Sequence, residues 1–255
     1  MGTIDLPAPV LAPYTRAQIR FAGSAWPMRA AEELRSALIF RALARDARAV
    51  GMAEPWPTRF RAAMRDELRH ARLCATVGAE LGAGEPEYDA RPLRARLARL
   101  PDPRLRAAAL LLVEIAMGET ISMYLFRAGR RATREPLTRA ALGAIVGDEV
   151  RHQRLGWTGM AGLWPILDRP LRAAVEREAA RGLAGCEQQI ALPAMRWLER
   201  RQPFDPAYAA LGVLHPEARV DAFYLAVERL VVPRLTRIGL DGPLAWNNRY
   251  RVAPS

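Results

Sequence analysis

The sequence predicts an all-α protein: a four-helix bundle with one long crossover, followed by a C-terminal helical extension. Long stretches rich in Ala, Leu, Arg and Glu are punctuated by proline and glycine, and no stretch shows the alternating pattern of a β-strand. A nine-residue phrase also occurs twice, as "RDELRHARL" at 65–73 and "GDEVRHQRL" at 147–155. With 51% hydrophobic residues, the chain of 255 residues has ample material for a core.

The first half of the bundle follows from helix start and stop signals. We expect a loose N-terminal arm over residues 1–23, broken by prolines and without the apolar run of a signal peptide. Ser24 and Pro27 are typical of a helix start and predict a first helix to about Val50, which "GMAEPWP" ends. Thr58 then opens a second helix, which carries the first copy of the phrase.

The second half is separated from the first by a long connection. Residues 83–102 contain three prolines, with a fourth at Pro103, and exceed a tight turn, so we expect a crossover there. A third helix is predicted over about 104–130, and a fourth, carrying the second copy of the phrase, over 136–164. The bundle then spans residues 24–165.

Residues 166–255 predict two or three more helices, one of them kinked at Pro193, packed on the bundle or covering its mouth. No uninterrupted apolar run approaches the roughly 20 residues that cross a bilayer, so we expect no membrane span and a cytoplasmic location. Cys74 and Cys186 lack CxxC spacing, which favours a reducing compartment and a buried structural role for Cys74.

The net charge is +11, because 38 basic residues outnumber 27 acidic ones, and all of the basic residues are arginine. They are spread along the helices and form no single run, which favours solvated helix faces over a nucleic-acid surface. Such a basic surface would instead attract an acidic partner by long-range steering.

The repeated phrase has the spacing of a metal site. Glu67 and His70 are three residues apart, as are Glu149 and His152, so each pair shares one face of a helix and is able to hold one ion. Carboxylates combined with imidazole suit iron or manganese, with coordination positions left for dioxygen or water. A single Glu and His at this spacing could be an ordinary pair on the helix surface. The occurrence of the same spacing in both copies of the phrase favours a metal site.

An aspartate precedes each of these glutamates. A metal-bound histidine normally donates its other N–H to a carboxylate, which fixes its tautomer. In an antiparallel two-fold arrangement Asp66 would serve His152 and Asp148 would serve His70; a solvent-exposed aspartate is the alternative at either position.

Four segments, "EELRSALIF", "DELRHARL", "MGETISMYL" and "DEVRHQRLGW", resemble the bacterial ferritin-like proteins of the di-iron carboxylate superfamily. That superfamily includes rubrerythrin-type proteins, ribonucleotide reductase small subunits and soluble di-iron oxygenases. The resemblance covers about residues 24–165 and does not clearly extend to the last 90 residues. It implies one further glutamate ligand on the first helix and another on the third.

Two glutamates compete for each of these places. On the first helix Glu33 is favoured over Glu32, because the residues one, two and three turns further on form an apolar face. On the third helix Glu114 and Glu119 lie about 140° apart in α-helical geometry and would not both face one metal pair. Glu119 is favoured because "GET" resembles the third-helix pattern of the superfamily, and Glu114 stays open. The resulting ligand set is Glu33, Glu67, His70, Glu119, Glu149 and His152.

The resemblance implies a di-iron, dioxygen-activating oxidoreductase that hydroxylates, N-oxygenates or desaturates an organic substrate. The alternatives are a manganese and iron pair in the same site, an iron-oxidising protein without an organic substrate, and a metal-free structural bundle. We expect a small-molecule or carrier-bound substrate, a homodimer, and an external electron donor, since no CxxC pair is present for electron transfer. Helical register suggests Phe40, Met123 and Trp157 as pocket residues, with core packing as the competing interpretation, whereas His215 lacks the motif and is expected to be structural or exposed.

Overall fold

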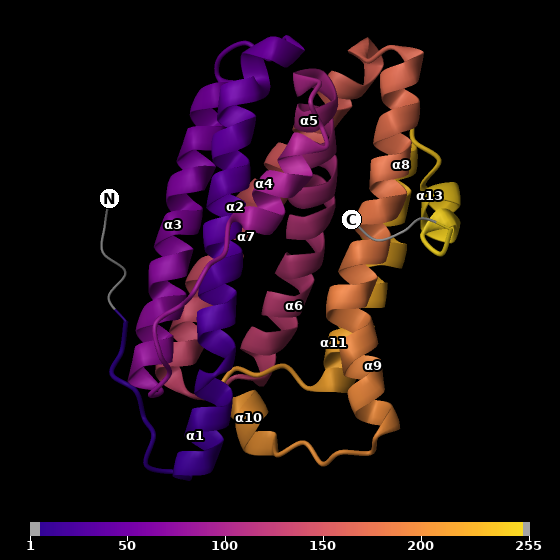
Figure 1. Ribbon diagram of the computed structural model, residues 1–255. Helices are drawn as coiled ribbons and strands as arrows, with labels where there is room; N and C mark the ends of the chain where they lie inside the picture. Colours follow the sequence, from indigo (N-terminus) through magenta and orange to yellow (C-terminus); the bar gives the residue numbers. More distant parts are fainter. Residues whose placement is uncertain (1–5, 252–255) are drawn as a thin grey trace.

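The computed structural model describes residues 6–251, and every regular element among them is helical. The prediction of an all-α protein is therefore confirmed. Four long segments form the bundle (Figure 1). They are α2 (Ala25–Asp46), α3 (Trp56–Glu80), the continuous segment α5–η2–α6 (Pro103–Ala109, Leu110–Gly118 and Glu119–Ala132) and α7 (Pro136–Leu163).

Two hairpins and one long connection make up the bundle. α2 packs along α3 and α6 packs along α7. The short turn after α2 is a 3₁₀ segment, η1 (Ala47–Val50), whereas residues 81–102 return the chain along the bundle from α3 to α5. This crossover is not all loop, because Arg91–Ala98 form α4 and Leu93 of that helix is buried against the bundle.

The N-terminal arm differs from the expectation. Residues Arg16–Gly23 form α1, where the sequence predicts a loose segment. The helix begins with a capping box, in which the Gln18 N–H donates to the Thr15 hydroxyl and the Thr15 N–H donates to the Gln18 side chain. Ser24 and Pro27 therefore mark the junction between two helices, not the first helix start.

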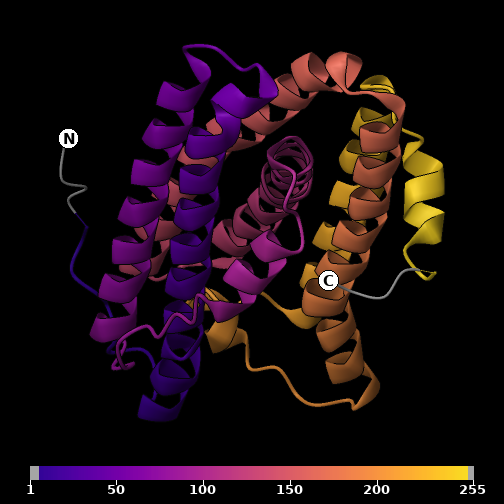
Figure 2. The same ribbon diagram turned by 45° about the horizontal axis from the view of Figure 1, so that its top comes forward.

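The third bundle helix is the most apolar segment. Pro103–Ala132 is long and apolar enough to cross a membrane by length and composition, but 67% of its apolar window is buried inside the molecule. In Figure 2 this helix lies between the α2–α3 hairpin and the C-terminal helices. Its hydrophobicity is thus explained by protein neighbours on both sides, as in the core helix of a soluble protein.

The C-terminal third of the chain is a layer of helices packed on the bundle. α8 contacts α5 and η2, and α11 contacts α6. Its elements, after the short turn η3 (Trp164–Ile166), are α8 (Arg169–Cys186), η4 (Glu187–Ala191), α9 (Leu192–Glu199), α10 (Pro206–Ala210), α11 (Pro216–Ala226), η5 (Val227–Val231), α12 (Val232–Arg237) and α13 (Gly242–Asn248).

The interruption expected at Pro193 takes the form of a π-helical segment. Proline lacks an N–H, and its ring collides with the carbonyl group four residues earlier in an α-helix. Just before Pro193 the Leu192 N–H bonds to the carbonyl of Glu187, five residues back, which widens the turn. The same device precedes Pro233, where η5 separates α11 from α12.

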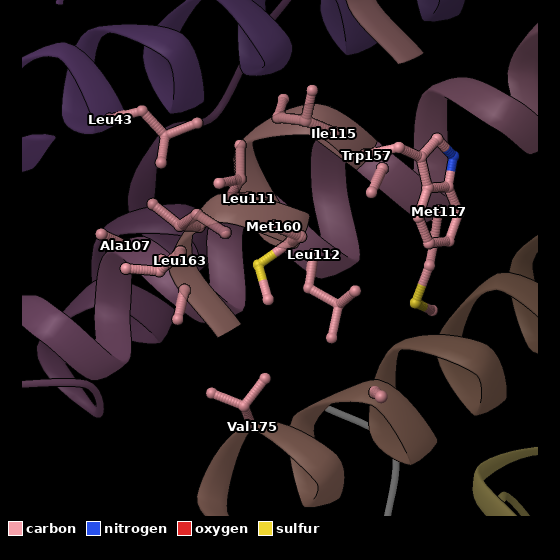
Figure 3. Packing of buried hydrophobic residues seen from close by; sticks show 14 of the residues in the cluster. Leu43, Ala107, Leu111, Leu112, Ile115, Met117, Trp157, Met160, Leu163 and Val175 are labelled. Atoms are coloured by element: carbon pink, nitrogen blue, oxygen red, sulfur yellow. The ribbon is translucent and has the colours of Figure 1, made fainter. Parts of the chain in front are cut away.

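The core extends across the boundary between the bundle and the C-terminal layer. Leu111, Leu112 and Ile115 of η2 are fully buried (Figure 3). They pack in one cluster with Met160 of α7 and Val175 of α8. The C-terminal helices therefore share a hydrophobic core with the bundle.

Candidate metal centre

The bundle places all six expected ligand residues in one buried cluster. They come from four segments: Glu33 from α2, Glu67 and His70 from α3, Glu119 from the start of α6, and Glu149 and His152 from α7. None is more than 6% exposed.

The cluster consists of two overlapping groups of possible ligands. One contains Glu33, Glu67, His70 and Glu149, and the other contains Glu67, Glu119, Glu149 and His152. Within each group the ligand atoms lie within 4.8 Å of one another. Glu67 and Glu149 belong to both groups, so either residue could supply a carboxylate oxygen to each of two ions.

Both imidazoles present Nδ1 to the interior. His70 Nδ1 lies 3.4 Å from Glu33 Oε2 and 3.6 Å from Glu149 Oε1. His152 Nδ1 lies 2.7 Å from Glu67 Oε1 and 3.4 Å from Glu149 Oε2. Inward Nδ1 atoms surrounded by carboxylate oxygens are a suitable donor set for iron or manganese.

Several of these ligand atoms make no hydrogen bond of acceptable geometry among the described residues, although His152 Nδ1 and Glu67 Oε1 lie close together. The atoms without a hydrogen bond are both carboxylate oxygens of Glu67, one oxygen of Glu149, and the Nδ1 atoms of His70 and His152, all fully buried. A buried polar atom left without a partner costs about 1–3 kcal/mol. Metal coordination would satisfy all five atoms, so the residues present fit a pair of metal ions.

The electrostatics of the cluster favour bound positive charge. Burial raises the pKa of Glu33 well above its ordinary value; the contact with His70 opposes the rise, and the charge of Glu67 adds to it. Burial, followed by the charges of Glu149 and Glu67, likewise raises the pKa of Glu119. Four carboxylates with two neutral imidazoles would exactly balance two divalent cations in charge, which lowers the energetic penalty of burying them.

The outward Nε2 atoms of the histidines contact aspartates across the two helices. His70 Nε2 lies 3.0 Å from Asp148 Oδ2, and His152 Nε2 lies 3.4 Å from Asp66 Oδ2. Each aspartate thus serves the histidine of the opposite helix. An Nε2–H donated to the carboxylate leaves Nδ1 unprotonated and available to a metal.

Two arginines close these contacts into a ring that the sequence reading missed. Arg69 Nη1 donates to Asp66 Oδ1 at 2.9 Å, and Arg69 also bonds to Asp148. Arg151 Nη2 donates to Asp148 Oδ1 at 2.5 Å and to Asp66 Oδ2 at 3.3 Å. The available signal was the arginine that precedes the histidine in both copies of the phrase.

The competing glutamates lie outside the cluster. Glu32 is exposed. Glu114 pairs with Arg35 at 2.8 Å and with Arg96. The angular argument against Glu114 does not apply, however, because Leu110–Gly118 is π-helical and a π-helix bonds residue i with residue i+5. The arginine partners, and not the helical angle, separate Glu114 from Glu119.

The three expected pocket residues are buried beside the cluster. The Phe40 ring lies 5.3 Å from the His152 ring, centroid to centroid. Trp157 Nε1 donates to Thr120 Oγ1 at 2.9 Å, and Gln153 Nε2 contacts Met123 Sδ at 3.3 Å. Each of the three side chains therefore contacts a polar or ligand residue of the bundle interior.

The remaining sequence candidates have structural positions. Cys74 is fully buried. His215 caps α11 by accepting a hydrogen bond from the Glu217 N–H at its Nδ1. A surface hollow between α8 and α13, lined by Ala173, Leu240 and Leu244 among others, includes none of the cluster residues.

No family model matches the chain, and no curated protein matches it. A solved structure does: a Synechococcus protein described as having aldehyde deformylating oxidase activity, with a TM-score of 0.61 and 18% sequence identity. The fold of this chain is ferritin-like. The match covers 92% of this chain and 98% of the Synechococcus chain. In this ferritin-like fold the C-terminal helices therefore belong to the shared architecture, although the sequence resemblance stops near residue 165.

Proposed function

We propose that the protein is a di-iron oxidoreductase that uses dioxygen to oxidise an organic substrate. The observation that carries the proposal is the pair of overlapping buried ligand groups that share Glu67 and Glu149. The similarity of fold to a protein with an oxidase activity supports it. An iron pair, or a manganese and iron pair in the same ligands, would supply the redox chemistry that side chains lack.

The residues around the centre would prepare it for this chemistry. Asp66 and Asp148 hold the histidine tautomers through Nε2. Burial of the six ligands excludes bulk water, and Phe40, Met123 and Trp157 would face the apolar part of a substrate. We assign no catalytic residue beyond the ligands.

The proposed reaction is hydroxylation, N-oxygenation or desaturation, with aldehyde deformylation added because the Synechococcus protein has aldehyde deformylating oxidase activity. Electrons would come from a separate donor, since the two cysteines of the sequence do not form a CxxC pair. An acidic donor would be drawn to the arginine-rich surface. We place the reaction in the cytoplasm, and a homodimer stays our proposed assembly.

The test is anaerobic loading with ferrous iron, determination of iron per chain, and measurement of oxygen uptake with a chemical reductant and a panel of organic compounds that includes aldehydes. About two irons per chain and oxygen uptake that depends on one compound, with an oxidised product, would support the proposal. Oxygen uptake that tracks only added iron, with accumulating ferric mineral, would favour iron handling, and the absence of iron uptake would refute both.

A further inference from the structure

A second group of unpartnered donors lies on α2, one turn before the metal cluster. Trp26, Arg29 and Glu33 follow one another at spacings of three and four residues, so they share one face of the helix. Arg29 and Glu33 are separated by about 6 Å along the helix axis. A molecule held at Arg29 would therefore extend readily to the metal ligands.

The donors at this place converge on the loop between α10 and α11. Arg29 Nη2 donates to the Gly212 carbonyl at 2.7 Å, and its guanidinium stacks on the Trp26 ring at 4.6 Å. Gly212 also lies close to the Trp26 ring. A Cβ added at Gly212 would be 3.3 Å from Trp26 Cζ2, a ring carbon two bonds from Nε1. In Figure 1 this loop lies at the end of the bundle where α1 meets α2.

Two of these donor atoms are buried and unused. Trp26 is fully buried, and neither its Nε1 nor Arg29 Nη1 has a hydrogen-bond partner among residues 6–251. Buried N–H donors of this kind are normally satisfied, and more so when the donor is charged. Both donors therefore need an acceptor that the described residues do not provide.

The missing acceptor is expected to be an anion. Burial lowers the pKa of Arg29 to about 10, with Cys74 and Glu33 opposing the shift and the charge of Arg219 adding to it. Arg219, half-buried on α11, likewise has a lowered pKa because of burial, and no carboxylate of the described residues pairs with either guanidinium. A buried guanidinium that forms no ion pair with a carboxylate favours a negatively charged ligand.

We propose that Trp26 Nε1 and Arg29 Nη1 bind the carboxylate of an organic acid, which is the substrate or a substrate analogue for the neighbouring metal centre. A carboxylate has two acceptor oxygens, one for Arg29 Nη1 and one for Trp26 Nε1. The apolar remainder of the molecule would run along α2 toward Glu33 and Phe40. This inference rests on the proposed function in taking the bound acid to be a substrate.

The experiment is calorimetric titration of the full-length, chelator-treated chain, so that a carboxylate has no metal to bind. The probes are hexanoate, the uncharged hexanamide, and inorganic phosphate. Hexanoate should bind about tenfold or more tightly than hexanamide, and Arg29→Gln should weaken it by a similar factor, because a hydrogen bond to a charged group is lost. Trp26→Phe, which keeps an aromatic ring and removes the N–H donor, should weaken hexanoate binding several-fold. Arg41→Gln, an exposed control on the same helix, should match the parent.

Equal affinity of the parent for hexanoate and hexanamide, or unchanged hexanoate affinity in Arg29→Gln, would overturn the carboxylate site. Tighter binding of phosphate than of hexanoate would also overturn it, in favour of a phosphate-bearing ligand. The outcome is separable from the proposed function, because hexanoate binding is measured without metal and oxygen uptake is measured with iron. Binding without oxygen uptake would leave this site standing and remove the oxidase.

Discussion

Single side chains of similar sequence context have opposite roles in this molecule. Glu32 and Glu33 are adjacent, yet Glu33 is 5% exposed and contacts His70, whereas Glu32 is exposed to solvent. Glu114 and Glu119 differ likewise, since arginines neutralise Glu114 while Glu119 faces the other carboxylates. What distinguishes a ligand from an ordinary acid here is the absence of a protein partner for its charge.

The adjacent glutamates give a matched test at the residue scale. Glu33→Ala should bind about one metal ion per chain in place of two, because Glu33 belongs to one ligand group only and the group with Glu119 stays complete. Glu32→Ala should keep both ions. Metal analysis after anaerobic loading and removal of excess iron measures the difference. Two ions in Glu33→Ala, or a loss in Glu32→Ala, would contradict the assignment.

The π segment η2 packs tightly against two neighbouring helices through glycines. α7 approaches η2 through Gly156, where an added Cβ would lie 2.5 Å from the Ala116 backbone nitrogen. α8 approaches it through Gly182, where a Cβ would lie 2.5 Å from a Val113 methyl carbon. Because Glu119 directly follows η2, the position of this carboxylate depends on the fit between η2 and its two neighbours.

Gly156→Ala should therefore destabilise the fold, although alanine is the better helix former. Forcing a methyl group against backbone is expected to lower the free energy of unfolding by about 1–3 kcal/mol. Gly162→Ala on the same helix, where a Cβ would meet nothing within 4 Å, should instead raise it by up to about 1 kcal/mol. Urea denaturation of both variants compares the two effects. An equal free energy of unfolding in the two variants would mean that η2 moves to accommodate the added methyl group without loss of stability.

At the scale of the whole molecule, the metal centre joins all four bundle segments. Its carboxylates and imidazoles come from α2, α3, α6 and α7. Unfolding of α3 or α7 would dismantle both ligand groups, and unfolding of α2 or α6 would dismantle one of them. The C-terminal helices lie on the other side of α5–α6 and share its core (Figure 2). Bound metal should thus stabilise the fold as one unit.

We expect thermal stability to rise with metal loading. Free metal at about 100 times its dissociation constant adds about 2.7 kcal/mol for one site that only the folded state provides. For a chain of this size that corresponds to a rise of about 5–10 °C in Tm. Calorimetry with ferrous iron under anaerobic conditions, and again with chelator, measures it. Glu67→Ala is the control, because Glu67 belongs to both groups, and an equal Tm rise in that variant would place the stabilising metal elsewhere.

The sequence by itself determined the all-α class, the hairpin–crossover–hairpin order, and the two Glu-x-x-His pairs, because these depend on helix periodicity and local spacing. Only the tertiary structure decided which of two adjacent glutamates faces inward and which of two on the third helix is neutralised by arginines. It also decided that the aspartates and arginines of the two phrases form one ring, and that α1, α4 and the π segments exist. These features depend on contacts between residues that are distant along the chain. The environment of each charge is set by its partners and its burial, and no local sequence pattern specifies either.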